Sequence, residues 1–215
     1  MSIGGQLPTC QILPCCGTLC CICGRYTITT PGEELASYFG ILPAQDAFGP
    51  TDDARPTENL PIVLQDDPNQ MVVGHWGYPI RLGGKDKELI NVRAESILGK
   101  PFFRKAANEC RCMILADGYF EWMREGEVKK KFRFTLERQP MAFAGIYQWT
   151  AKKLSNEIRP FYSIITSQAT GEAATIHDRM PVILPPGHEK SWLIGLFNEK
   201  LLAPYEGTLA IRPTA

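Results

Sequence analysis

Short runs of β-branched and aromatic residues do most to constrain the fold of this chain. Gly, Pro, Asp or Asn residues bound these runs, which is typical of strands that end in turns. Thr30, Pro31 and Glu33 form a helix start with Thr30 as the N-cap. We therefore expect one α+β domain rich in antiparallel strands. The strand-like runs are residues 25–30, 59–65, 71–80, 111–123, 130–136, 141–150 and 161–168, and the helical patterns are residues 30–40, 94–109 (interrupted by Pro101), 170–178 and 188–197.

The charge balance limits how the chain can attract a partner. Its 23 Lys and Arg residues equal its 23 Asp and Glu residues, so the formal net charge is zero. Any site for an anion must therefore come from a local cluster of cations. With 215 residues, the chain can bury roughly two-thirds of its unfolded surface without disulfides, so we expect a substantial hydrophobic core.

The cysteines are crowded at the N-terminus. A secreted disulfide scaffold spreads its cysteines along the chain, so this distribution indicates a cytoplasmic protein. The segment before Arg25 lacks Lys and Arg and is interrupted by Pro and Gly, unlike a signal peptide or a membrane span. We expect residues 1–22 to be a leader, or a misassigned or processed extension, and residues 23–215 to be the folded domain. The eight cysteines are Cys10, Cys15, Cys16, Cys20, Cys21, Cys23, Cys110 and Cys112.

A metal site is a weaker interpretation of these cysteines. Cys20 and Cys23 have the spacing of a zinc knuckle, but Cys110 and Cys112 do not have a usual ligand spacing. The second pair also lies on a strand-like run, where small apolar residues belong. We expect no metal and no cofactor.

Several polar or aromatic residues stand where a strand or its end should be apolar, and each also has an ordinary interpretation. A carboxylate on a strand can be solvated, a histidine can cap a helix, an arginine can pair with a carboxylate, and a tryptophan can belong to the core. Taken singly, these residues do not indicate a function. They are Asn91 and Arg93 in NVRAES, Glu121 in ADGYFEW, His177 and Arg179 in IHDRMPVIL, and Trp76 in HWGYP.

Taken together and in order, these motifs resemble the SRAP family (SOS response-associated peptidase). The resemblance extends from residue 23 to about residue 190 and is carried by CGRY, DARPT, WGYP, NVRAES, RCMILADGYFEW, FAGIY, SIITSQAT and IHDRMPVIL. It implies a single α+β domain of largely antiparallel, curved, barrel-like sheets flanked by helices. It also implies a role in the DNA damage (SOS) response.

The resemblance implies a sensor of abasic sites in single-stranded DNA that cross-links to them through an N-terminal cysteine, which corresponds to Cys23. A free α-amine titrates near about pH 8, so part of it is neutral and can attack the sugar aldehyde to form an imine. The thiol of the same residue can then close a thiazolidine ring. A lyase-like strand cleavage through the same imine is an expected side reaction.

The resemblance also implies roles for three catalytic partners of Cys23. Asn91 would hold the amine or the thiol by hydrogen bonds. Glu121, with a pKa raised by its aromatic neighbours, would carry protons during imine formation and ring closure. His177 would protonate the sugar ring oxygen and so open the sugar to its aldehyde form.

Five further residues are expected to bind the DNA. Arg25, Arg93 and Arg179 would hold phosphates beside the lesion, while Pro56 and Trp76 would stack on or wedge beside bases. We expect the partner to be single-stranded DNA with an abasic site, and we expect no membrane association and no obligate protein partner. The protein is expected to be a monomer, which in a bacterium would gather at the nucleoid during repair.

The N-terminus departs from the family pattern, because Ile22 precedes Cys23 and an amide nitrogen cannot form an imine. Two other functions therefore stay open: a thiol autopeptidase that removes its own leader, with Cys23 as nucleophile and His177 as base, and a noncovalent single-strand binding module. Smaller departures are Asp53 and Arg55 in DARPT, where NIAPT is usual, and Leu115, where the family usually has Pro.

Overall fold

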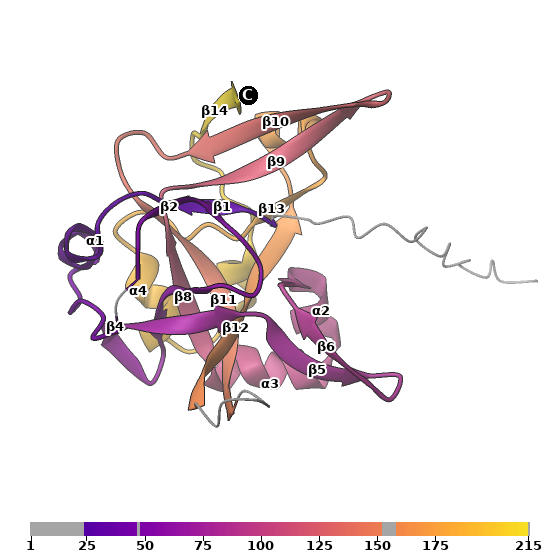
Figure 1. The fold of residues 1–215 in the computed structure, drawn as a ribbon. Helices are drawn as coiled ribbons and strands as arrows, with labels where there is room; N and C mark the ends of the chain where they lie inside the picture. The colour runs from indigo at the N-terminus through magenta and orange to yellow at the C-terminus, as the bar shows by residue number, and fades with distance from the viewer. Residues whose placement is uncertain (1–23, 47, 152–157, 215) are drawn as a thin grey trace, which may run out of the picture.

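The computed structural model describes residues 24–46, 48–151 and 158–214 (Figure 1). The strands are β1 (Tyr26–Ile28), β2 (Thr51–Ala54), β3 (Asn59–Leu64), β4 (Asp67–Trp76), β5 (Tyr78–Leu82), β6 (Lys85–Leu89), β7 (Asn91–Arg93), β8 (Arg111–Ala116), β9 (Gly118–Glu125), β10 (Val128–Thr135), β11 (Met141–Ala151), β12 (Ile158–Gln168), β13 (Arg179–Pro181) and β14 (Ala210–Thr214). The helices are α1 (Gly32–Phe39), α2 (Ala94–Gly99), α3 (Pro101–Glu109) and α4 (Glu189–Ile194), with 3-10 helices η1 (Gly171–Thr175) and η2 (Glu199–Leu202).

A closed barrel of five strands forms the centre of the fold. Its strands pair in the order β11, β8, β3, β4 and β12, and β12 pairs back onto β11. The β12–β4 pair is parallel and the other pairs are antiparallel. Strands β7 and β13 extend this sheet from the far end of β12. The expected α+β fold with largely antiparallel, barrel-like sheets is confirmed.

Closure of the barrel depends on a glycine in β11. Gly145 faces Ile164 of β12 and Cys112 of β8, and a Cβ atom at this position would lie 2.8 Å from the Ser163 carbonyl oxygen. Such a contact is too short for any side chain, so the close approach of three strands requires glycine here.

A second sheet lies across one end of the barrel, at the top of Figure 1. Its order is β14, β10, β9, β1 and β2, with antiparallel pairing throughout. Strands β5 and β6 form a separate hairpin that projects from the lower right of the same view. No helix among the described residues is long and apolar enough to span a membrane.

The expected helix start at Thr30 is wrong, and the reason lies in a contact distant in sequence. Helix α1 begins at Gly32, and Pro31 occupies the N-cap without a side-chain cap. The Thr30 hydroxyl instead donates to the Asp117 carboxylate at 2.7 Å, and Thr29 donates to the same group. Asp117 follows β8 directly, and its carboxylate therefore links the turn between β8 and β9 to the residues that precede α1.

Arg111, at the start of β8, joins two helices from a buried position. Its side chain is 1% exposed and lies over the Trp192 ring, with 5.5 Å between the guanidinium carbon and the ring centroid. The guanidinium donates to carbonyl oxygens at the end of α3 and at the end of α4. Helix ends leave such carbonyls without partners inside the helix, so one cation satisfies both ends. The accepting residues are Ala107, Asn108, Trp192, Leu193 and Gly195.

We expect Arg111→Lys to lower the free energy of unfolding by about 3 kcal/mol. A lysine keeps the charge but cannot reach both helix ends with a planar set of donors, so buried carbonyls lose their partners. Urea denaturation measures the change.

Arg104→Lys is the matched control, because Arg104 pairs with Glu199 at 2.9 Å on the surface, where both side chains are about half exposed. This control should cost less than about 1 kcal/mol. Equal effects of the two substitutions would contradict a special role for Arg111.

Candidate functional site

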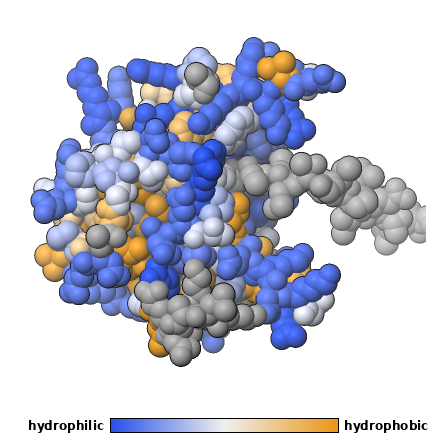
Figure 2. Space-filling view, in the orientation of Figure 1, coloured by the Kyte–Doolittle hydropathy of each residue, from blue (hydrophilic) through white to orange (hydrophobic). Residues whose placement is uncertain are grey.

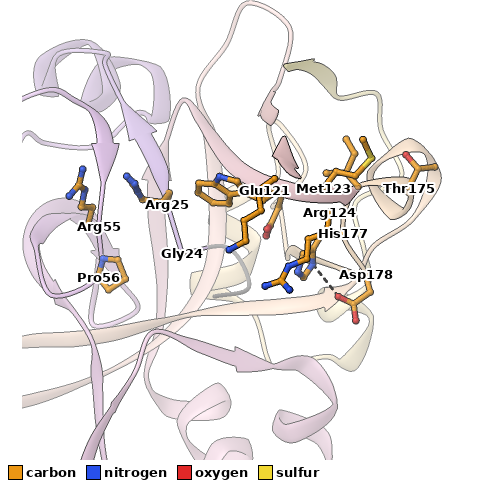
Figure 3. A pocket seen from close by; sticks show the side chains of 13 residues that line it. Gly24, Arg25, Arg55, Pro56, Glu121, Met123, Arg124, Thr175, His177 and Asp178 are labelled. Atoms are coloured by element: carbon orange, nitrogen blue, oxygen red, sulfur yellow. Dashed lines mark ion pairs between the residues drawn. The ribbon is translucent and has the colours of Figure 1, made fainter. Parts of the chain in front are cut away.

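A cavity of about 680 Å³ lies where β1 begins, and it contains four of the residues predicted from the sequence. Arg25, Pro56, Glu121 and His177 all line it. Figure 3 shows Arg55 and Pro56 on one side, His177 and Asp178 on the other, and Glu121 between them. Gly24 also lines the cavity, whereas Cys23, the residue before it, lies outside the described residues.

The cavity follows from the shortness of β1. The Phe120 amide donates to the Arg25 carbonyl at 2.9 Å, and β1 pairs with β9 through Tyr119 and Gly118. Beyond Phe120, no strand that the structure describes pairs with this edge of β9. The residues of β9 from Glu121 to Arg124 therefore line the cavity.

Glu121 is 1% exposed although it lines the cavity. Its cross-strand neighbour is Phe132 of β10, and the aromatic side chains of Phe120 and Trp122 flank it in sequence. The ordinary interpretation of Glu121 as a solvated strand residue is therefore wrong. A buried carboxyl group at the wall of a cavity is well placed to exchange protons with a bound molecule.

The surroundings of His177 select one tautomer. Its Nδ1 lies 3.0 Å from the Arg179 amide, which can only donate, and 3.1 Å from Oδ1 of Asp178, which can only accept when ionised. Nδ1 cannot serve both at once. The Asp178 side chain is 87% exposed, so its ion pair is weak. The hydrogen bond from the Arg179 amide therefore decides which ring nitrogen is protonated when His177 is neutral. Neutral His177 therefore carries its proton on Nε2.

Arg25 and Arg55 share one carboxylate. Arg25 binds both oxygens of Asp53 at 2.7 and 2.9 Å, and Arg55 binds the same carboxylate at 2.5 and 2.9 Å. Both arginines line the cavity. Asp53 and Arg55, which depart from the usual NIAPT motif, therefore form one ion cluster with Arg25 that keeps a net positive charge.

The cavity has an excess of cations that sequence reasoning missed. Besides Arg25, it is lined by Arg55, Arg124 and Lys129, and the carboxylates that line it are Glu121 and Asp178. Four cations against two carboxylates favour an anionic ligand. Arg124 and Lys129 belong to an alternation of cations along the hairpin of β9 and β10. This pattern can be recognised only when the register of the two strands is known.

Trp76 does not belong to the site. It is fully buried, its indole nitrogen donates to the Ile90 carbonyl at 2.9 Å, and its ring centroid lies 5.0 Å from that of Tyr26. The prediction that it stacks on a base is wrong, because the ring would have to leave the core. The ordinary interpretation as a core residue holds.

Arg179 and Arg93 flank the end of β12 but do not line the cavity. Arg179 is 8% exposed and binds Glu95 at 2.7 and 3.1 Å and the Thr166 carbonyl at 2.6 Å. The hydrogen bond from Arg179 lowers the pKa of Glu95. Arg179 thus serves as an ion-pair partner rather than an open phosphate contact, whereas Arg93 is exposed and opposite Thr166.

Asn91 begins β7 and is half-buried opposite Ile164 of β12. It does not line the cavity, so its convergence with Glu121 and His177 stays a prediction. Among the described residues, no cluster of three or more His, Cys, Asp or Glu side chains could hold a metal ion.

Comparison with known proteins defines the class to which this fold and cavity belong. The model of the family "SOS response associated peptidase (SRAP)" matches residues 22–214, so the chain belongs to the SRAP family. Among its relatives, the "Abasic site processing protein YoaM" of Bacillus subtilis (strain 168) is 32% identical over 203 residues, which cover 86% of this chain and 87% of the relative. The "Abasic site processing protein YedK" of Escherichia coli (strain K12) is 34% identical over 120 residues, covering 55% of this chain and 52% of the relative.

Solved structures share the fold. An X-ray structure of a protein from Bacteroides thetaiotaomicron superposes with a TM-score of 0.78 at 23% identity and covers 90% of this chain and 92% of that one. A structure from Bordetella bronchiseptica gives a TM-score of 0.73 at 22% identity, covering 90% of this chain and 100% of the other. These likenesses concern the fold alone.

Proposed function

We propose that this protein senses abasic sites in single-stranded DNA and processes them by forming a covalent cross-link through Cys23. The proposal draws on membership of the SRAP family and on relatives named abasic site processing proteins. The observation that carries it is the cavity that begins at Gly24, next to Cys23 in sequence, and holds the buried Glu121 together with His177.

His177 opens the sugar in the first step of the proposed reaction. The proton donor is the protonated imidazole, in which Nδ1 pairs with Oδ1 of Asp178 at 3.1 Å and Nε2 carries the proton that is transferred. Protonated His177 donates its Nε2 proton to the ring oxygen of the abasic sugar. The bond between that oxygen and C1′ breaks, the C1′ hydroxyl loses its proton to water, and the aldehyde forms.

Cys23 then supplies both nucleophiles, provided that residues 1–22 have been removed. Its α-amine adds to the aldehyde carbon and expels water to give an imine. Its thiol adds across the C=N bond, so that sulfur binds carbon, the proton ends on nitrogen, and a thiazolidine ring closes. Glu121 accepts and returns protons during both additions.

Cations position the strand around this chemistry. Arg25 and Arg55 lie at one side of the cavity with Pro56, and their guanidinium groups suit the phosphates that flank a lesion. Pro56 offers an apolar edge beside a neighbouring base. Since these contacts read backbone and not base edges, the protein tolerates changes in sequence.

We expect intact-mass spectrometry of the processed chain to show a mass gain equal to the abasic oligonucleotide minus one water. An oligonucleotide with thymidine at the same position should give no gain. The same lesion in a duplex should react more slowly than in a single strand, because the flanking bases cannot be splayed into the cavity. An equal yield with the thymidine oligonucleotide, or no yield with the abasic one, would contradict the proposed function.

A further inference from the structure

All charged residues on one face of the three strands β14, β10 and β9 are cations. Side chains alternate between the two faces of a strand, and the pairing of Phe120 with Arg133 and of Arg133 with Arg212 sets which residues share a face. The two carboxylates of these strands, Glu121 and Glu125, lie on the opposite face. We call the first face the basic face; its cations are Arg124, Lys129, Lys131, Arg133 and Arg212.

Like charges lie directly opposite each other on this face. Arg124 faces Lys129 across β9 and β10, and Arg133 faces Arg212 across β10 and β14. Directly opposed like charges destabilise a sheet. Among the ion pairs that join described residues, none includes a cation of the basic face. An arrangement of this kind gains stability when an anion bridges the cations.

The basic face connects the main cavity with a second one. Arg124 and Lys129 line the main cavity, whereas Arg133 and Arg212, with Arg138, line another of about 290 Å³. Lys131 lies between them, with its ammonium 3.8 Å from the centroid of the Phe120 ring.

The spacing along β10 fits a chain of phosphates. Residues 129, 131 and 133 alternate with residues of the opposite face, so neighbouring cations are about 7 Å apart along the strand. This step is comparable with the distance between successive phosphates of an extended single strand. Figure 2 shows mostly hydrophilic residues at the top of the molecule, where Figure 1 places β9, β10 and β14.

We propose that the basic face binds the sugar-phosphate backbone of single-stranded DNA where the strand leaves the main cavity. This inference rests on the proposed function, which places the lesion in that cavity. A nucleic acid fits better than a membrane surface, because the cations form a row that starts inside the cavity and ends in a second cavity. Contacts of this kind add affinity without reading sequence.

The test is the double variant Lys131→Gln, Arg212→Gln, since neither residue lines the main cavity. Binding is measured with undamaged oligonucleotides of about five and about twenty nucleotides, which span the range of known single-strand site sizes. With the longer strand, we expect the affinity to fall about tenfold and the slope of log affinity against log salt to become shallower by about 1.4. With the shorter strand, the affinity should not change.

The matched control is Lys105→Gln, Lys130→Gln, which also removes two positive charges. Lys130 stands between Lys129 and Lys131 in sequence but faces the other way and pairs with Glu125 at 2.7 Å; Lys105 lies on α3. This control should bind both oligonucleotides as the unchanged protein does.

The proposal is overturned if the double variant matches its control on the longer strand, or if both strands lose affinity equally. Tighter binding of the unchanged protein to anionic phosphatidylserine vesicles than to the longer strand would also overturn it. The rate of cross-linking to a short abasic oligonucleotide reports separately on the proposed function. A failed cross-link with the expected loss of long-strand affinity would reject that function and leave the basic face as a DNA-binding surface.

Discussion

A chain that begins at Cys23 is expected to form a heat-stable adduct with abasic single-stranded DNA, and a chain that retains residues 1–22 is expected to form none. The difference should be all or nothing, because an amide nitrogen cannot become an imine. Denaturing gel electrophoresis after heating, with intact mass for identity, measures both chains. The mass of the longer chain must be shown not to change during the assay.

Two substitutions sharpen this experiment. Cys23→Ser at the new N-terminus keeps the α-amine, so a transient imine should still be trapped by borohydride, but no heat-stable adduct should form, since a hydroxyl adds far less readily than a thiolate. Cys20→Ser and Cys21→Ser in the longer chain should not change the adduct yield of that chain. An uncleaved longer chain that cross-links as well as the shorter one would show that the α-amine is not the nucleophile.

The experiment also separates the alternative functions. Loss of residues 1–22 from the purified chain without added protease would support a thiol autopeptidase, and Cys23→Ser should then stop it. Binding without any adduct, from either chain, would leave a noncovalent single-strand binding module.

Glu121→Gln is expected to slow cross-linking by about 10²- to 10⁴-fold, the usual contribution of a positioned proton carrier. Glutamine keeps the size and hydrogen-bonding reach of the side chain but cannot exchange a proton at these steps. Single-turnover kinetics with a saturating abasic oligonucleotide isolates the chemical step. The affinity for undamaged DNA should not decrease, because one negative charge has been removed from a cavity that favours anions.

Glu125→Gln is the control for this substitution. Glu125 lies on the same strand but is half exposed and pairs with Lys130 at 2.7 Å. The Glu125→Gln variant should cross-link to the abasic oligonucleotide at the rate of the unchanged protein. If Glu121→Gln unfolds at the same temperature as the unchanged protein and still reacts at its rate, the carboxyl group is not the proton carrier.

Strand patterns predicted most of the central architecture, and the errors come from contacts distant in sequence. The runs at residues 59–65, 141–150 and 161–168 became barrel strands, because β-branched and aromatic residues fill a pleated, buried surface. The run at residues 111–123 divides at Asp117, whose carboxylate holds Thr29 and Thr30. A local capping pattern could not reveal that Asp117 competes for the Thr30 hydroxyl.

The residues of the site were predictable by type but not by environment. Glu121 and His177 appear in motifs that resemble the SRAP family, yet alternation alone favoured a solvated Glu121. Its burial against Phe132 of β10 and its place in the cavity wall, at the open edge of β9, are both tertiary features. Trp76 shows the opposite failure, since the family resemblance predicted a ring that stacks on bases, and packing against Tyr26 buries it.

Cationic surfaces could not be predicted before the register was known. The sequence KKK at residues 129–131 reads as one charged run, but the pleat sends Lys130 to one face and Lys129 and Lys131 to the other. Arg212 lies far away in sequence and joins them only because β14 pairs with β10. Pairing between strands thus decides which charges act together.

The shared carboxylate of Asp53 fixes the rim of the cavity before any ligand arrives. Immobilising a long side chain at an interface costs about 0.5–1.5 kcal/mol, and here folding has already restrained Arg25 and Arg55. In the proposed function, their guanidinium groups would therefore meet a phosphate without rearrangement, while Asp53 offsets part of their charge. We therefore expect the rim to discriminate by geometry: a strand whose backbone bends to match the two restrained guanidinium groups would gain from both, and a straight polyanion of equal charge would gain little.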